Sequence, residues 1–196
     1  LQWQYETGGP VSSSPAVAGG TVFVGSNDAH VYALDTRTGS LQWRYETGYR
    51  VSYSPAVAGG TVFVGSNDAH VYALDTRTGS LQWRYETGGP VWSSPAVADG
   101  TVFIGSLDTH VYALDAHAGS LQWRYKTGHP VSSSPAVADG TVFVGSRDNH
   151  VYALDARTGS FQWRYKTDNV VRSSPVVADG TVFVGSYDGH VYALGG

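Results

Sequence analysis

A repeat of 40 residues constrains this chain more than any other feature. The segment Ala33–Trp43, ALDTRTGSLQW, returns unchanged at 73–83, as ALDAHAGSLQW at 113–123 and as ALDARTGSFQW at 153–163. The same segment is divided between the two ends of the chain, because Trp3 lies near the first residue and Leu194 near the last. A fixed period of this length indicates that one supersecondary unit is copied and that each copy packs against the next.

Composition excludes several classes of function. The 196 residues contain neither cysteine nor methionine, so disulfides, thiolate metal sites and thiol catalysis are ruled out. The net charge of −4, with 14% charged residues, provides no basic surface for nucleic acid. No apolar run approaches the ~18 residues needed to cross a bilayer, so we expect no membrane insertion.

Each repeat contains four short apolar runs separated by turn residues, which predicts four strands, named A to D. In the first repeat they cover Val11–Ala18, Thr21–Ser26, His30–Leu34 and Leu41–Thr47. Two glycines between strands A and B, replaced by Asp-Gly in later copies, supply the positive φ of a tight hairpin. Strands B and C are apolar on both sides, so both faces of each sheet must be covered. Strand D alternates apolar and polar residues, as expected of an outer strand with one solvated side.

Four-stranded antiparallel sheets that are covered on both faces by identical neighbours describe the blades of a β-propeller, and a linear solenoid is the alternative. The chain is therefore predicted to be all-β and to form one domain, 1–196, of five blades. Leu1–Thr7 is a lone D strand, so we expect it to pair beside His190–Leu194 and close the ring without an open edge. The expected blades cover 8–47, 48–87, 88–127, 128–167, and 168–196 together with 1–7, and the expected closed protein is a monomer.

The repeated segment resembles the tryptophan-docking motif of the pyrroloquinoline-quinone (PQQ) repeat family, Ala-x-Asp-x-x-Thr-Gly-x-x-x-Trp, and the resemblance covers every repeat. Two positions depart from the motif, with Ala118 in place of threonine and Gly195 in place of aspartate. The resemblance implies that the motif tryptophans pack between neighbouring blades and stack on backbone near the motif glycine. These structural docking residues are Trp3, Trp43, Trp83, Trp123 and Trp163.

The family that the chain resembles includes enzymes and non-catalytic propellers. Its eight-bladed quinoprotein dehydrogenases add a vicinal cysteine pair, calcium-binding side chains and a catalytic aspartate outside the repeat consensus, whereas another member is a scaffold lipoprotein of outer-membrane assembly. This chain has no cysteine, and every carboxylate except that of Asp168 occupies a recurring repeat position. We therefore expect no PQQ, no other cofactor and no enzymatic activity. The resemblance also favours a periplasmic or extracellular location.

Two further patterns have both a functional and a structural interpretation. The Asp-x-His unit, first seen at Asp28 and His30, recurs in all five repeats, and a ring of imidazoles would suit a metal site or a pH switch. Alternatively, the aspartate holds the BC turn and the histidine bonds a neighbouring backbone group; radial spacing keeps the imidazoles apart, so no metal site is predicted. Ser13 and Ser14 lack a nucleophile-elbow context and a local histidine with an orienting acid, so no catalytic residue is predicted.

Differences among the copies indicate a candidate binding surface. Bulky substitutions gather in the connection from strand D to the next strand A and in the BC turn, which emerge on one side of an up-and-down blade, here named the DA/BC face. Loops held by a rigid scaffold often carry binding residues, although drift at exposed loops gives the same pattern. Tyr53, Trp92 and Arg172 are expected nearest the central opening. The predicted ligand-binding residues are Tyr49, Arg50, Tyr53, Trp92, His129, Arg147, Arg172 and Tyr187, of which Tyr49, Arg50, His129 and Arg147 are expected further out.

The sequence favours a non-enzymatic scaffold or binding module with a protein, peptide or glycan ligand on the DA/BC face and no nucleic-acid partner. Two alternatives remain open. The first two 40-residue copies share 36 identical residues, which favours a recently amplified or designed repeat protein without a ligand. An enzyme, as the remnant of a quinoprotein dehydrogenase, would need cofactor ligands that the chain lacks.

Overall fold

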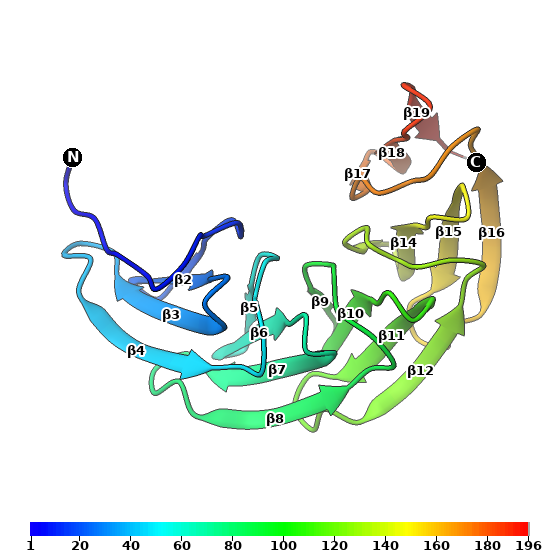
Figure 1. Cartoon of the computed structure of the whole chain (residues 1–196). Coiled ribbons are helices and arrows are strands. Elements are labelled where there is room, and N and C mark those ends of the chain that lie inside the picture. The colour runs from blue at the N-terminus through cyan, green and yellow to red at the C-terminus, as the bar shows by residue number, and fades with distance from the viewer. Residues whose placement is uncertain (196) are drawn as a thin grey trace.

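The computed structural model describes residues 1–195, in which antiparallel sheets follow one another along an arc (Figure 1). Each of the first four sheets has four strands in sequence order, and the last sheet has three. Strand A of each sheet lies on the inside of the arc and strand D on the outside. No helix among the described residues is long and apolar enough to cross a membrane.

The strands recur at the positions that the repeat predicts. Strands A are β1 (Ala16–Ala18), β5 (Ala56–Ala58), β9 (Ala96–Ala98), β13 (Ala136–Ala138) and β17 (Val176–Ala178). Strands B are β2 (Thr21–Gly25), β6 (Thr61–Gly65), β10 (Thr101–Gly105), β14 (Thr141–Gly145) and β18 (Thr181–Gly185). Strands C are β3 (His30–Asp35), β7 (His70–Asp75), β11 (His110–Asp115), β15 (His150–Asp155) and β19 (Val191–Leu194). Strands D are β4 (Leu41–Glu46), β8 (Leu81–Glu86), β12 (Leu121–Lys126) and β16 (Phe161–Lys166).

The turns form as their residue types predict. In the third repeat Asp99 and Gly100 have φ of 47° and 73°, the left-handed conformation that a two-residue hairpin requires. In the CD loop, Asp35 Oδ1 accepts hydrogen bonds from the backbone N–H of Arg37 at 3.0 Å and of Thr38 at 2.8 Å. The aspartate of the repeated segment therefore caps its own loop.

Strand A is shorter than the sequence predicts, because β1 begins at Ala16 and not at Val11. Pro15 has no N–H to donate to a neighbouring strand. Upstream of it, a side chain takes over the pairing: Ser13 Oγ donates to the Gly25 carbonyl at 2.9 Å and accepts from the Gly25 N–H at 3.0 Å. The serine is thus more than a small residue, since its hydroxyl anchors the innermost segment to strand B.

The hydrophobic core lies between consecutive sheets. In the first interface Phe23, Val31, Ala33 and Trp43 of one sheet pack against residues of the next sheet, which are Val62, Val64, Tyr72 and Leu74. We name the first surface the end face of a sheet and the second the start face. The same contact recurs in the next two interfaces, so at these interfaces the apolar faces of strands B and C are covered as predicted.

Strand D follows the predicted alternation only in part. Trp43 is 8% exposed, whereas Leu41, which the alternation places on the same side, is 41% exposed. A bulge in the pairing of β3 with β4, between Ala33 and Leu34, shifts the register there. A bulge bends the strand and re-aims its side chains, so Trp43 and Tyr45 are directed into the interface whereas Leu41 is not.

The motif tryptophans join neighbouring sheets, as the resemblance implies. Trp83 Nε1 donates to the Ala116 carbonyl of the next sheet at 3.0 Å. Its ring lies against Gly119, where an added Cβ would come within 2.5 Å of Trp83 Cδ2. Equivalent hydrogen bonds of 2.9 Å are donated by Trp3, Trp43 and Trp123. For Trp163 the equivalent acceptor is residue 196, which lies outside the described residues.

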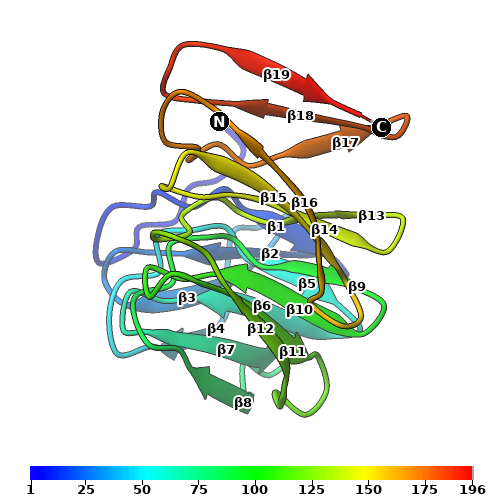
Figure 2. The same cartoon turned by 90° about the vertical axis from the view of Figure 1, so that its right-hand side faces the viewer.

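The predicted ring closure is not formed in this structure. The last sheet holds β17, β18 and β19, and no fourth strand joins it within residues 1–195. Figure 1 shows residues 1–7 at one end of the arc and these three strands at the other, and Figure 2 shows β19 at the free edge of its sheet. Residues 1–7 pack instead on the first sheet, where Trp3 Nε1 donates to the Thr36 carbonyl at 2.9 Å. The repeated interface sets the angle between sheets, and five sheets at that angle leave the arc open.

Substitution of the motif glycine tests the docking of tryptophan. Gly119→Ala places a methyl group against the Trp83 ring at a φ of 69°. We expect a loss of ~1–2 kcal/mol in the free energy of unfolding from the left-handed backbone. Displacement of the ring adds a share of the ~3–5 kcal/mol that deletion of a buried aromatic side chain costs. Denaturant unfolding monitored by tryptophan fluorescence measures the sum.

Gly100→Ala is the matched control for this experiment. Gly100 has a similar φ of 73°, but an added Cβ meets no atom within 4 Å. The control should therefore show the backbone cost alone. Equal destabilisation by the two substitutions would show that the tryptophan does not require a glycine beneath it.

The CD-loop aspartates should make stability depend on pH. The backbone N–H and then the hydroxyl of Thr78 lower the pKa of Asp75. A carboxyl group whose pKa is lower in the folded state stabilises the protein above its unfolded value of about 3.9, and this stabilisation is lost as the pH falls through the folded-state pKa. We expect Asp75→Asn to lower the melting temperature at pH 7 and the difference from the native chain to vanish at low pH.

Asp115→Asn provides the comparison, because Ala118 leaves Asp115 with two backbone N–H donors and no hydroxyl donor. Gln122 adds only a weaker hydrogen bond to Asp115, so loss of the strong hydroxyl donor should give a smaller difference at neutral pH. Melting temperatures of the native chain and of both variants, measured from about pH 2 to pH 7, test this prediction. A difference between Asp75→Asn and the native chain that stays constant over this range would contradict the assignment.

Candidate functional site

The DA connections and BC turns adjoin on one side of the arc, as the sequence predicts. The Asn67 N–H donates to the Arg50 carbonyl of the same repeat at 2.9 Å. The Val51 N–H donates to the Ser26 carbonyl of the preceding repeat at 3.0 Å. Each DA connection is therefore tied to two BC turns, and the DA/BC face is a continuous surface on which residues of different repeats meet.

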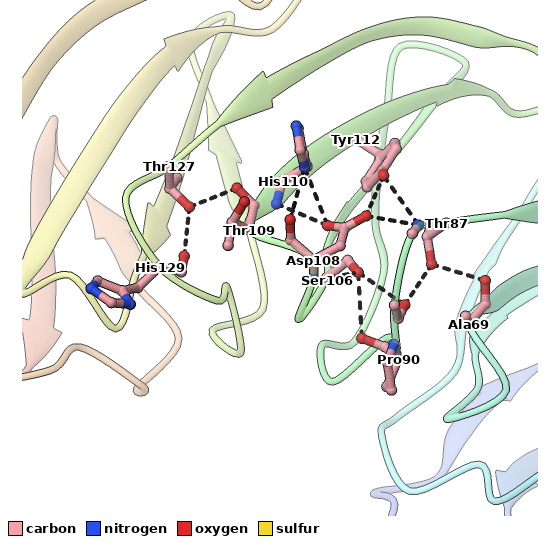
Figure 3. A network of polar contacts seen from close by, with 12 residues as sticks. Ala69, Thr87, Pro90, Ser106, Asp108, Thr109, His110, Tyr112, Thr127 and His129 are labelled. Carbon is pink, nitrogen blue, oxygen red and sulfur yellow. Dashed lines mark hydrogen bonds and ion pairs between the residues drawn. The ribbon is translucent and has the colours of Figure 1, made fainter.

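The aspartate of each Asp-x-His unit organises its BC turn (Figure 3). Asp108 Oδ1 accepts from the His110 N–H at 3.0 Å, and Oδ2 accepts from the Gly88 N–H at 2.7 Å and from the Tyr112 hydroxyl. His110 Nδ1 lies 3.0 Å from the Asp108 carbonyl oxygen. The structural interpretation of this unit is confirmed, because both carboxylate oxygens and one imidazole nitrogen bond within the turn region. Among residues 1–195, no group of three or more His, Cys, Asp or Glu side chains is placed to hold a metal ion.

The tyrosine and the aspartate of this network stay in complementary protonation states. Burial, and then the hydrogen bond to Asp108, raises the pKa of Tyr112 to about 12. In the first repeat burial acts to raise the pKa of Asp28, but hydrogen bonds, beginning with that from the Tyr32 hydroxyl, lower it overall. At neutral pH the Tyr32 phenol is a neutral donor and the Asp28 carboxylate a charged acceptor, so this turn is held by a charge-assisted hydrogen bond.

Five of the predicted binding residues form what we name the inner cluster: Tyr53, Trp92, Arg147, Arg172 and Tyr187. The guanidinium carbon of Arg147 lies 5.5 Å from the centroid of the Trp92 ring, and that of Arg172 lies 5.0 Å from the centroid of the Tyr187 ring. Burial raises the pKa of Tyr53, and the charges of Arg147 and Arg172 act on it in the opposite direction. The charges of both arginines thus act on this phenol, although the five residues of the inner cluster belong to four different blades.

Arg147 lies nearer the centre than the sequence predicts, because it contacts Trp92 of the inner cluster. Its Nε donates to Ser132 Oγ at 3.2 Å, and this serine is buried. The bond holds the guanidinium over the Trp92 ring of the preceding repeat. A buried acceptor in its own repeat thus directs the arginine toward the inner cluster.

The other predicted residues lie outside the inner cluster. Tyr49 is 52% exposed, and the Arg50 guanidinium lies 5.6 Å from the centroid of its ring. The His129 carbonyl accepts from Thr127 Oγ1 at 2.7 Å, and Figure 3 shows its imidazole directed away from the network. These side chains are accessible, but the structure does not bring them together with the inner cluster.

Two buried polar atoms beside the inner cluster were not anticipated. Trp92 Nε1 and Asn67 Oδ1 are inaccessible and have no hydrogen-bond partner among the described residues. At the equivalent positions of the preceding repeats, Ser52 Oγ donates to Asn27 Oδ1 at 2.9 Å. Trp92 stands where other copies carry serine, so the hydroxyl donor for Asn67 is missing. The missing donor is visible in the sequence. Asn67 repeats Asn27, but Ser52, which follows Asn27 by 25 residues, is replaced by Trp92 at the equivalent position.

The inner cluster combines three kinds of chemistry. Aromatic rings offer flat apolar surfaces, and the two arginines offer charged donors to carboxylates or phosphates. The unpaired buried N–H of Trp92 and the unpaired buried carbonyl oxygen of Asn67 each cost about 1–3 kcal/mol. A hydroxyl group, which both donates and accepts, could pair with both atoms only after a movement of the Trp92 side chain exposed them.

Repeated four-stranded sheets, each with its strand A on the inside of the arc, are the blades of a β-propeller built from PQQ-like repeats. The sequence profile of the family described as outer membrane protein assembly factor BamB matches residues 1–52, 47–133 and 108–195. These matches cover nearly the whole chain, and the chain belongs to this family. No curated protein matches it in sequence.

Solved structures show the same fold. BamB from Moraxella catarrhalis superposes with a TM-score of 0.87 at 24% identity, over 97% of this chain and 63% of that protein. Quinohemoprotein alcohol dehydrogenase ADHIIG from Pseudomonas putida HK5 gives 0.80 at 20% identity, over 98% and 41%. The quinohemoprotein alcohol dehydrogenase from Comamonas testosteroni gives 0.81 at 20% identity, over 95% and 41%. The chain thus spans less than two thirds of each of these proteins.

The donor set of this chain does not fit the quinone cofactor that the family name suggests. The resemblance implies a vicinal cysteine pair and carboxylate ligands for calcium, and the sequence has no cysteine. The BC-turn carboxylates, represented by Asp108, accept hydrogen bonds from their own turn, and the CD-loop carboxylates, represented by Asp35, cap their own loops. The residues that vary on the DA/BC face are aromatic and basic, a different set of donors.

Proposed function

We propose that this chain is a non-enzymatic binding scaffold whose ligand docks at the inner cluster of the DA/BC face. The observation that carries the proposal is convergence: residues that break the repeat, Tyr53, Trp92, Arg147 and Arg172, come from four blades and gather at one place. Drift at exposed loops would scatter such residues around the rim. A rigid β-scaffold with a few variable loop residues is a common way to build a binding site.

The use of the polar side chains supports a non-enzymatic role. The Ser13 hydroxyl bonds both the N–H and the carbonyl of Gly25, so it serves as a backbone anchor. The Asp108 carboxylate accepts two backbone N–H groups and a phenol. Groups of the types that act as nucleophile or general base in enzymes are here engaged in holding turns and strands.

The chemistry of the inner cluster favours a glycan with an acidic group. A movement of the Trp92 side chain would expose its unpaired N–H and the Asn67 carbonyl oxygen, which are buried in this structure and would then match the dual hydrogen bonding of a sugar hydroxyl. Arg172 is exposed and can form a bidentate contact with a carboxylate. The Trp92 and Tyr53 rings are partly exposed and offer flat surfaces to the apolar face of a sugar ring.

A protein partner on the same face is the second candidate. The family description names an assembly factor, which is a role among proteins. Tyr49, Arg50 and His129 are exposed beyond the inner cluster, and they would enlarge a contact surface beyond the size of one sugar. Tyrosine and arginine are enriched among residues that dominate protein interfaces.

Glycan and peptide arrays probed with the labelled chain test the proposal. We expect binding to acidic glycans and a loss of at least about tenfold in affinity for Trp92→Ser combined with Arg172→Ser, equivalent to about 1.4 kcal/mol. Folding should be retained, because the equivalent positions 12, 52 and 132 carry serine. Circular dichroism and thermal melting verify this.

Arg77→Ser is the matched control, since Arg77 lies in a CD loop on the opposite rim and is exposed. Binding should be unchanged by this substitution. Retained affinity in the double variant, or a loss caused by Arg77→Ser, would place the ligand elsewhere. Selective binding to peptides would favour the second candidate, and no binding to either array would leave a scaffold without a ligand site.

A further inference from the structure

Grooves open between consecutive sheets on the rim opposite the DA/BC face, where the AB hairpins and the CD loops emerge. They lie at the first three interfaces and have volumes of about 660, 360 and 540 Å³. Ligand pockets of proteins generally have volumes of ~300–1,000 Å³. A threonine and a phenylalanine of strand B line each groove on one side, and the CD loop of the next sheet lines it on the other side.

The groove between the third and fourth sheets, here named the third groove, carries charges of both signs. Asp99, in the AB hairpin of the third sheet, lines one side, and Arg157, in the CD loop of the fourth sheet, lines the other. Both residues are exposed. Every ion pair among residues 1–195 joins a histidine to an aspartate, so no ion pair joins Asp99 to Arg157. The groove therefore separates an unpaired carboxylate from an unpaired guanidinium.

Asp155 adds a second carboxylate to the third groove. Its Oδ1 accepts from the Arg157 N–H at 3.1 Å and from the N–H and the hydroxyl of Thr158 at 2.8 and 2.7 Å. The hydroxyl and then the backbone N–H of Thr158 lower the pKa of Asp155, so this group is charged at neutral pH. Its Oδ2 has no hydrogen-bond partner within the described part of the chain and remains available as an acceptor.

The two sides of the third groove are held in fixed positions. Trp123 Nε1 of the third sheet donates to the Ala156 carbonyl of the fourth at 2.9 Å, and the Ala156 N–H donates to the Gly140 carbonyl at 2.8 Å. On the other side Thr101 Oγ1 donates to Gln122 Oε1 at 3.1 Å. A ligand would therefore enter a preformed groove, which lowers the entropic cost of binding.

The other two grooves lack this arrangement of charge. Gly19 occupies the place of Asp99 in the first groove, and no acidic residue lines that groove. In the second groove Gly59 occupies this place, and His117 lies in the CD loop. Asp99 lines the second groove as well, but from the same sheet as His117. Of the three grooves, only the third has a carboxylate on one sheet facing an arginine on the next.

We propose that the third groove binds a short peptide with two charged ends, a dipeptide or a tripeptide. The terminal ammonium would pair with Asp99, and the terminal carboxylate would accept two parallel hydrogen bonds from Arg157. The Asp155 Oδ2 would accept from a peptide N–H. Packed sheets lie about 10 Å apart, and an extended peptide of two or three residues spans up to ~7–11 Å, so its ends reach both sides. The site is separate from the inner cluster and does not depend on the function proposed for that cluster.

An NMR titration of the isotope-labelled chain with three probes tests the proposal. The probes are alanyl-alanine, its N-acetylated form without an ammonium, and its C-terminal amide without a carboxylate. We expect alanyl-alanine to shift the amide resonances of Gly100 and Arg157 in a saturable way. Each blocked probe should bind at least about fivefold more weakly, because it loses one charge-assisted hydrogen bond.

Two substitutions assign the ends of the peptide. Asp99→Gly should lower the affinity for alanyl-alanine at least about fivefold and leave that for the N-acetylated probe unchanged. The variant should fold, because Gly19 has the same role in its hairpin with a φ of 56°. Arg157→Ala should weaken alanyl-alanine by a similar factor and leave the C-terminal amide unchanged.

Asp179→Gly and Arg37→Ala are the matched controls, since both residues are exposed in an AB hairpin and a CD loop outside the third groove. Both variants should bind alanyl-alanine like the native chain. The absence of saturable shifts up to ~10 mM, equal affinity for the three probes, or an undiminished affinity in Asp99→Gly would overturn the proposal. Shifts confined to the DA/BC face would also overturn it, because they would place the peptide at the inner cluster.

Discussion

Docking of a tryptophan on the backbone of the next sheet is the interaction on which the whole architecture depends. Trp83 bonds the Ala116 carbonyl and covers Gly119, and the same contact recurs from Trp3, Trp43 and Trp123. A ring that must fit over a glycine at one distance fixes the angle between two sheets. Because every interface uses the same parts, the angle repeats, and the arc follows from one contact copied along the chain.

The repeated interfaces between sheets do not use the variable side chains of the DA/BC face, so these side chains can differ among the copies. The turns there are held by invariant groups, with Asp108 bonded to Gly88, His110 and Tyr112. The side chains that differ among copies do not take part in those bonds, so they can vary without loss of the turn. Trp92, Arg147 and Tyr53 illustrate this, because the scaffold decides where these positions lie and the substitutions decide which side chains stand there.

The sequence by itself determined the local structure. The 40-residue period, the Gly and Asp-Gly turns and the apolar runs predicted the strands, because these depend on short-range sterics repeated in every copy. The packing of tryptophan on glycine was implied by the family resemblance of the repeated segment. The sequence did not determine the curvature of the arc, because the angle between two close-packed sheets cannot be read from a pattern of residues. Closure by residues 1–7 was therefore predicted and is not formed. Nor could it pair Arg147 with Trp92, because those residues are 55 positions apart and meet only where the arc brings blades together.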